Sequence, residues 1–167
     1  MATIKVIAPD KLIYKNQTYK CSIGLSGVSD SKKENDGTTP AGKYKIRSVL
    51  YRADKVTRPV TLLDAEPIKT NDVWCDNPQK KEYNRKVKYS NDFTTEKLWR
   101  EDNLYDLIVV IGYNDDPVIA GKGSAIFMHV AKPDYETTRG CIALKLADLY
   151  QILKTLKPLD TIFILNS

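Results

Sequence analysis

The sequence has little histidine and no close pair of cysteines. His129 is its one histidine among 167 residues, so no second imidazole base is available. No Cys-x-x-Cys pair occurs, and the usual zinc ligand sets draw on several cysteines and histidines. We therefore expect neither a bound metal nor a metal-dependent reaction.

Long apolar runs are also missing. The N-terminal apolar stretch is interrupted by Lys5 and Pro9, and it is too short for a signal-peptide core or a membrane span. As given, the chain is expected to be cytoplasmic, and a removed leader would place it in the periplasm or cell wall. The three cysteines (Cys21, Cys75 and Cys141) are an odd number, which leaves at least one thiol free and favours a reducing compartment.

Internal repeats, low-complexity segments and Pro/Gly/Ser-rich linkers are absent, so we expect residues 1–167 to form one domain and a monomer. The net charge is +5, and residues 79–100 hold seven Lys/Arg against three Asp/Glu, a local excess of four. No nucleic-acid-binding motif accompanies this segment. It is interpreted as a solvated loop or as a rim that attracts an anionic ligand.

Short β-rich runs separated by turn signals predict a mainly β fold with one or two short α-helices. The residue pattern predicts a polar loop at 29–42 and a helix that begins at Leu146 and is stopped by Pro158. A second short helix is predicted within 94–103. The expected strands are residues 3–8, 11–14, 17–26, 43–51, 107–113, 125–130 and 161–165.

Cys141 and His129 are the candidate catalytic residues. A thiol becomes a good nucleophile when a base removes its proton, and histidine suits that role. His129 lies twelve residues before Cys141, a distance that allows a loop to leave the predicted strand ending at His129 and to return the cysteine beside the imidazole. Gly140 permits a tight backbone before the thiol, so neighbouring amides can point at a developing oxyanion.

Several segments then carry a family resemblance. The block Gly-Ser-Ala-Ile-Phe-Met-His ending at His129, followed by Thr-Arg-Gly-Cys-Ile-Ala-Leu around Cys141, resembles the signature of the L,D-transpeptidase (YkuD-like) catalytic domain. Upstream, residues 36–44 (Asp-Gly-Thr-Thr-Pro-Ala-Gly-Lys-Tyr) are similar to another segment of that family. A third segment, Trp-Cys-Asp-Asn-Pro at 74–78 with Tyr-Asn-Arg at 83–85, is similar to a less-studied branch.

The resemblance implies a β-rich sandwich or barrel-like fold and acyl transfer without a cofactor. The implied substrate is a peptidoglycan stem peptide or muropeptide, from which Cys141 would expel D-alanine through a thioester, and carbapenem-type inhibitors would acylate the same thiol. His129 would act as base and then acid, oriented by a backbone carbonyl. Gly140 would line the oxyanion site with the amides of Arg139 and Cys141.

Alternative functions stay open. An L,D-carboxypeptidase that trims muropeptides would share the whole site, whereas a catalytically idle peptidoglycan-binding module would not need the thiol. A cysteine peptidase or amidase with an unrelated substrate would share only the nucleophile. For substrate binding, Arg139 is the first candidate because a guanidinium matches a carboxylate. The further candidates are Thr138, Arg85, Tyr83 and Tyr113.

Overall fold

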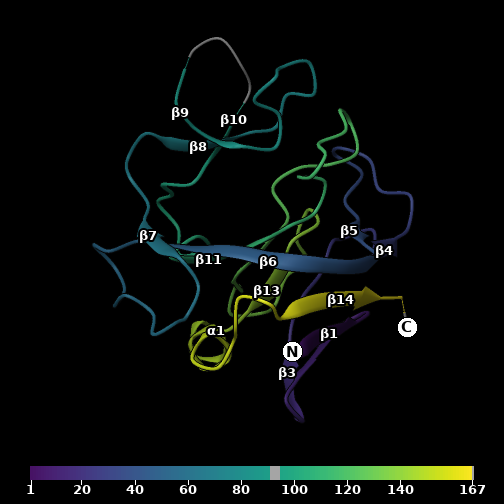
Figure 1. Cartoon of the computed structure of the whole chain (residues 1–167), viewed down its shortest axis with the longest axis vertical. Helices are drawn as coiled ribbons and strands as arrows, with labels where there is room; N and C mark the ends of the chain where they lie inside the picture. The colour runs from purple at the N-terminus through teal and green to yellow at the C-terminus, as the bar shows by residue number, and fades with distance from the viewer. Residues whose placement is uncertain (91–94, 167) are drawn as a thin grey trace.

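Strands dominate the computed structural model, which describes residues 1–90 and 95–166 (Figure 1). Alternating buried and exposed positions mark most of the longer strands, as expected for sheets with one apolar face. In chain order the elements are β1 (Thr3–Ile7), β2 (Lys11–Tyr14), β3 (Gln17–Lys20), β4 (Val28–Ser29), β5 (Thr39–Pro40), β6 (Gly42–Tyr51), β7 (Ala65–Pro67), β8 (Asp72–Cys75), β9 (Lys86–Lys88), β10 (Thr95–Lys97), β11 (Leu107–Ile111), β12 (Phe127–Val130), β13 (Ile142–Leu144), α1 (Leu146–Leu153) and β14 (Thr161–Leu165).

The main sheet closes almost completely on itself. Its strand order is β13-β12-β11-β6-β14-β1-β2-β3, with β7 paired to β6. Beyond the end of β3, Ser22 forms a bridge to Ala143 of β13 through two backbone hydrogen bonds of 2.9 Å. The two edges of the sheet therefore meet, which confirms the predicted mainly β, barrel-like fold and protects both edges from further pairing.

Two apolar cores lie on opposite faces of this sheet. The first fills the interior of the barrel, where α1 contributes Leu149, Ile152 and Leu153. The second lies outside the barrel, and it includes Phe127, Tyr105 and Cys141. Trp74 of β8 packs against this second core, so the three-stranded sheet β10-β8-β9 covers it. In Figure 1 this small sheet stands above β6, on the side away from β14 and α1.

The predicted second helix is wrong. Residues 95–97 form strand β10, which pairs with β8 between Glu96 and Trp74; residue 94 lies outside the described residues. Pairing with a neighbouring strand outweighs the local helix signal here, as is common for short segments. Within the described residues α1 is the one α-helix, and it ends at Leu153, ahead of the expected stop at Pro158.

The other strand predictions are confirmed: β2 and β14 have the predicted bounds, β6 is one residue longer, and the remaining four are shorter. The run predicted at 17–26 pairs with β2 only as far as Lys20, because the Cys21 amide then bonds to the carbonyl of Asp10 and the chain turns towards β13. The expected loop at 29–42 contains the short strand β5 and the end of β4.

Candidate active site

Cys141 and His129 lie on one face of two adjacent parallel strands. β12 and β13 pair in parallel with His129 opposite Ala143, so Cys141, two residues earlier, lies beside Phe127. Side chains two residues apart share a face of a sheet, which puts Cys141 and His129 on the side of the outer core. Strand spacing and rise place their Cα atoms about 8 Å apart. The two side chains therefore face the same side of the sheet, and among the described residues no hydrogen bond joins the thiol to the imidazole.

The Cys141 thiol is held by two backbone contacts. Its Sγ donates a hydrogen bond to the carbonyl of Ala125 (3.2 Å) and accepts one from the amide of Phe127 (3.4 Å). Burial raises the pKa of Cys141 to about 12, with the charge of Glu96 adding to the rise, while the Phe127 amide and Lys32 oppose it. The resting thiol is therefore protonated.

The His129 ring is oriented by a main-chain carbonyl. Its Nδ1 lies 2.9 Å from the oxygen of Val130, and because a carbonyl only accepts, this contact assigns the proton to Nδ1 and leaves Nε2 as the basic nitrogen. Burial lowers the pKa of His129 to about 4. The ring also packs edge-on against Tyr105, with centroids 5.3 Å apart. The site at rest is a neutral imidazole beside a neutral thiol.

The buried, neutral state of His129 makes stability depend on pH. An unfolded histidine takes up a proton near pH 6.5, whereas the folded one resists protonation down to about pH 4. The free energy of unfolding is therefore expected to fall by about 3 kcal/mol through this group as pH drops across that window. Urea unfolding of wild type and His129→Gln across the same window measures it. The glutamine variant loses less stability, and parallel curves for the two proteins would contradict the assignment.

Gly140 joins two of the motifs seen in the sequence. Its φ of +147° is a glycine conformation, and a Cβ there would lie 2.8 Å from the carbonyl oxygen of Thr38. Thr38 belongs to the Asp-Gly-Thr-Thr-Pro segment, so that segment packs directly against the turn before Cys141. The Thr138 hydroxyl braces the same turn: it donates to the Cys141 carbonyl (2.6 Å) and accepts from the Gly140 amide (3.0 Å).

Lys32 is a buried cation beside this turn, and its place in the site was not predicted from the sequence. It is 6% exposed, and its Nζ donates to the Thr38 carbonyl (2.7 Å) and to Asp36 (3.0 Å). The same Nζ lies 3.4 Å from where a Gly140 Cβ would be. Its charge acts to lower the pKa of Cys141. A lysine in a polar loop gives no sequence signal that it will fold inward.

Tyr105 and Glu96 form a second group that the sequence did not reveal. The Tyr105 hydroxyl donates to the Glu96 carboxylate, and the ring also packs edge-on against Phe127 at 5.8 Å. Burial raises the pKa of Glu96. The guanidinium of Arg100 lies 5.1 Å from the Tyr105 ring centre. Tyr105 therefore links the imidazole to a half-buried carboxyl group on β10.

Asn84 ties the third sequence motif to the thiol. Its Oδ1 accepts from Trp74 Nε1 (2.9 Å) and from the Ala125 amide (3.1 Å), and its Nδ2 donates to the carbonyls of Tyr113 (3.0 Å) and Asn114 (2.8 Å). Ala125 is the residue whose carbonyl holds the thiol, and it sits at a positive φ of 55°. Asn84 thus fixes an unfavourable backbone conformation next to Cys141.

The remaining candidate residues lie in three settings. Arg139 is exposed on the turn before Gly140 and has no hydrogen bond or ion pair with the described residues. Tyr83 is buried and donates to Glu34 (2.7 Å). Arg85 is exposed and donates to the Asp115 carbonyl (3.2 Å).

Tyr113 lies in the third setting, an open cleft of about 560 Å³ whose lining includes Lys32 but not Cys141.

The described part of the chain has no group of three or more His, Cys, Asp or Glu side chains placed to hold a metal ion. Neither does any helix among the described residues have the length and apolar character needed to cross a bilayer. Much of the basic segment at 79–100 is paired: Lys86 with Glu66 (2.6 Å), Lys88 with Asp72 (2.5 Å) and Arg100 with Asp102 (2.6 Å). Residues 91–94 of that segment lie outside the described residues.

The fold and site define a mainly β protein with a buried thiol and imidazole on neighbouring parallel strands. Residues 3–164 match the sequence model of the L,D-transpeptidase catalytic domain, YkuD. The chain belongs to this family, whose members modify peptidoglycan. Among curated proteins, no sequence match was found.

Solved structures align with this chain at low sequence identity. The helical cell shape determining protein Pgp2 from Campylobacter jejuni aligns with a TM-score of 0.50 and 16% identity over 99% of this chain and 48% of that one. Bd1075 from Bdellovibrio bacteriovorus aligns with a TM-score of 0.49 and 14% identity over 98% of this chain and 47% of that one. The chain spans about half the length of these proteins.

Proposed function

We propose that this chain is an L,D-transpeptidase-type acyl transferase that uses Cys141 to cleave peptidoglycan stem peptides and release D-alanine. The observation that carries the proposal is a backbone-anchored thiol on the same sheet face as an imidazole of the neighbouring strand, whose Nδ1 faces a carbonyl. That tautomer leaves Nε2 to accept the thiol proton. Family membership supports peptidoglycan as the substrate class.

In the proposed reaction, Nε2 of His129 takes the proton of Cys141 as Sγ attacks the carbonyl carbon of the third stem residue. A C–S bond forms, the C–N bond to D-alanine breaks, and His129 returns the proton to the leaving amine. An incoming amine or water then attacks the thioester and restores the thiol. The Cys141 amide and the charge of Lys32 are assigned to stabilise the oxyanion, since the Gly140 amide already bonds to Thr138.

The neutral resting pair explains why activation would wait for substrate. With pKa values of about 12 for Cys141 and about 4 for His129, transfer of the proton between them is unfavourable without a developing bond to carbon. Attack on the carbonyl moves negative charge from sulfur to the oxyanion, so proton transfer and C–S bond formation are expected to be concerted. Arg139, exposed beside the turn, is assigned to the carboxylate of the departing D-alanine.

Mass spectrometry of a disaccharide-tetrapeptide incubated with the protein, with and without a D-amino acid, tests the proposal. Release of D-alanine alone identifies hydrolysis, and an exchange product identifies transfer. Either product supports acyl transfer through a thioester, and its identity shows whether water or an amine attacks that thioester. An unchanged tetrapeptide in both reactions would overturn the proposed function.

Carbapenem acylation provides an independent check. A β-lactam carbonyl is attacked by the same thiol, so the intact protein is expected to gain the mass of one carbapenem at Cys141. Peptide mapping locates the adduct and separates Cys141 from the other two buried thiols, Cys21 and Cys75. An adduct at one of those cysteines in place of Cys141 would contradict the assignment of the nucleophile.

A further inference from the structure

The proposed reaction needs the His129 imidazole in one orientation, yet a single hydrogen bond holds this ring among the described residues. That bond joins Nδ1 to the carbonyl of Val130, the next residue on the same strand (2.9 Å). Rotation of the ring about its Cβ–Cγ bond would break it, and either nitrogen could then carry the proton. The orientation of the base therefore depends on what packs against the ring.

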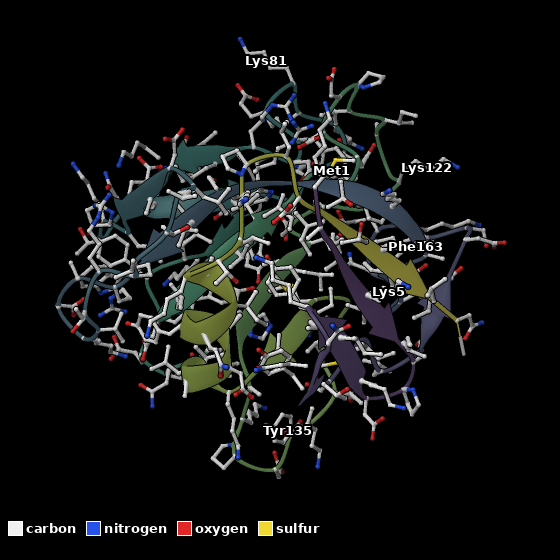
Figure 2. All side chains as sticks on the ribbon, turned by 60° about the horizontal axis from the view of Figure 1, so that its bottom comes forward. Met1, Lys5, Lys81, Lys122, Tyr135 and Phe163 are labelled. Atoms are coloured by element: carbon white, nitrogen blue, oxygen red, sulfur yellow. The ribbon has the colours of Figure 1, made fainter. Side chains whose placement is uncertain are left out.

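The loop that joins His129 to Cys141 extends away from the small sheet. Its tip, Tyr135, lies at the end of the molecule opposite Lys81, which belongs to the connection between β8 and β9 (Figure 2). The Tyr135 ring contacts Lys20, whose ammonium lies 4.7 Å from the ring centre. The aromatic ring that packs against His129 comes from another part of the chain, the turn before β11.

Tyr105 of this turn is placed to limit rotation of the imidazole. Its ring is buried and packs edge-on against His129, with centroids 5.3 Å apart and an interplanar angle of 71°. The turn is also tied to the strand of the base, because the Val130 amide donates to the carbonyl of Leu104 (3.0 Å). The position of the Tyr105 ring therefore bears directly on the orientation of His129.

Glu96 of β10 holds the hydroxyl end of Tyr105. The Tyr105 hydroxyl donates a hydrogen bond to the Glu96 carboxylate. Strand pairing places Glu96 opposite Trp74 of β8, and the Trp74 ring packs against Phe127 with centroids 5.0 Å apart. The amide of Phe127 donates to the Cys141 thiol. The carboxylate thus belongs to a segment that is packed against β12, the strand of the base.

A carboxylate at this position is unfavourable in two ways, which indicates a role for it. Burial raises the pKa of Glu96, so the ionised form is destabilised. After burial, the charge of Glu96 is the next cause that raises the pKa of Cys141, which works against the thiolate. A neutral side chain would avoid both effects. What the carboxylate supplies is an acceptor for the Tyr105 hydroxyl, and perturbed carboxyl groups are common at functional sites.

We propose that Glu96 and Tyr105 are positioning residues for the proposed acyl transfer: the carboxylate fixes the tyrosine ring, and that ring keeps the His129 imidazole in the orientation with its proton on Nδ1. Neither residue has to touch the substrate. The inference rests on the proposed function, since it assigns the two side chains to the same reaction. It also gives the small sheet a role, because β10 carries the group that orients the base.

Nitrogen-15 NMR of the imidazole in untagged protein tests the positioning directly, because His129 is the one histidine of the chain. At neutral pH the two ring nitrogens of the wild type are expected to give well-separated signals, since one tautomer is held. Tyr105→Phe keeps the ring and removes the hydroxyl, and Glu96→Ala removes the acceptor. In both variants the signals are expected to move towards each other as the second tautomer becomes populated. Signals that stay at their wild-type positions in both would overturn the proposal.

The kinetics of D-alanine release give the second readout. Tyr105→Phe and Glu96→Ala are each expected to lower kcat by about tenfold or more and to change KM by less than about twofold, because the base and not the substrate is displaced. The double variant is expected to lose no more than either single variant, since all three lack the same bond. Glu96→Gln keeps an acceptor oxygen and is expected to recover most of the kcat lost in Glu96→Ala. Additive losses, or no recovery in Glu96→Gln, would contradict a pair joined through that bond.

Tyr14→Phe is the matched control. Tyr14 is a buried tyrosine of the inner core whose hydroxyl donates to the Asp160 carboxylate and to the Thr155 carbonyl (3.2 Å each). Its substitution is expected to lower the Tm while leaving the His129 signals and kcat unchanged. If Tyr14→Phe altered those signals as much as Tyr105→Phe, the effect would be a general loss of packing and the pair would have no positioning role. The NMR measurement needs no substrate, so a wild type that released no D-alanine would overturn the proposed function and still allow the orientation of His129 by the pair to be decided.

Discussion

Alanine in place of Cys141 is expected to lower the rate of D-alanine release by about 10⁴-fold or more, as found when a catalytic nucleophile is removed. No other thiol can replace it, because Cys21 and Cys75 are buried in other parts of the fold. The substitution also leaves the Phe127 amide without its sulfur acceptor, at a cost of about 1–3 kcal/mol in stability. Product release is followed by mass spectrometry and folding by thermal unfolding.

Cys21→Ala is the matched control, since it removes another buried thiol (1% exposed, against 9% for Cys141) from the inner core. It is expected to lower stability while leaving the rate of D-alanine release close to that of the wild type. If Cys141→Ala retained wild-type activity, or if Cys21→Ala lost as much, Cys141 would not be the nucleophile.

Asn84→Ala is expected to lower the free energy of unfolding by about 3 kcal/mol or more, because it removes four hydrogen bonds at a buried position. The Trp74 Nε1 group and the Ala125 amide would lose their acceptor. Without that bond Ala125 is free to leave its positive φ, which shifts the carbonyl that holds Cys141. We therefore expect D-alanine release to fall as well, in the fraction of protein that remains folded.

Two further variants separate this role from a general loss of packing. Asn84→Asp keeps the shape and both acceptor bonds but turns two carbonyl contacts repulsive, so it is expected to destabilise nearly as much as alanine. Asn103→Ala removes an exposed amide whose described side-chain contact is a 3.4 Å bond from Lys55, and it is expected to change stability by less than about 0.5 kcal/mol. Wild-type stability in Asn84→Asp would contradict the four-bond arrangement.

Alternation and apolar runs predicted seven of the nine strands of the main sheet, because each of those seven has at least one buried face. The continuous run at β11 is buried at all five positions, as expected for a central strand. The failure at residues 95–97 has a physical cause. The polar strand β10 has no pattern of its own, and it exists because β8 offers it a pairing edge.

The placement of Cys141, His129 and Gly140 together was predictable because the three lie in one sequence block joined by a short loop. Lys32, Glu96 and Asn84 were not, since their contacts arise only from the fold: Lys32 lies beside Gly140, Glu96 accepts from Tyr105 across a turn, and Asn84 accepts from Ala125. In the sequence, a lysine or glutamate that becomes buried cannot be distinguished from one that stays on the surface, because its neighbours are known only from the fold. The third motif, Trp-Cys-Asp-Asn-Pro with Tyr-Asn-Arg, has a structural role: its Trp74 and Asn84 support the backbone around the thiol.

The buried state of the thiol bears on its fate under oxidative stress. Peroxides oxidise the thiolate form of cysteine, and with a pKa of about 12 only about one Cys141 side chain in 10⁵ is ionised at neutral pH. Limited access through the outer core slows such attack further. The sulfur of Cys141 is therefore kept as the thiol, which peroxides oxidise slowly. We expect sulfenic acid to form at Cys141 far more slowly than at a free cysteine.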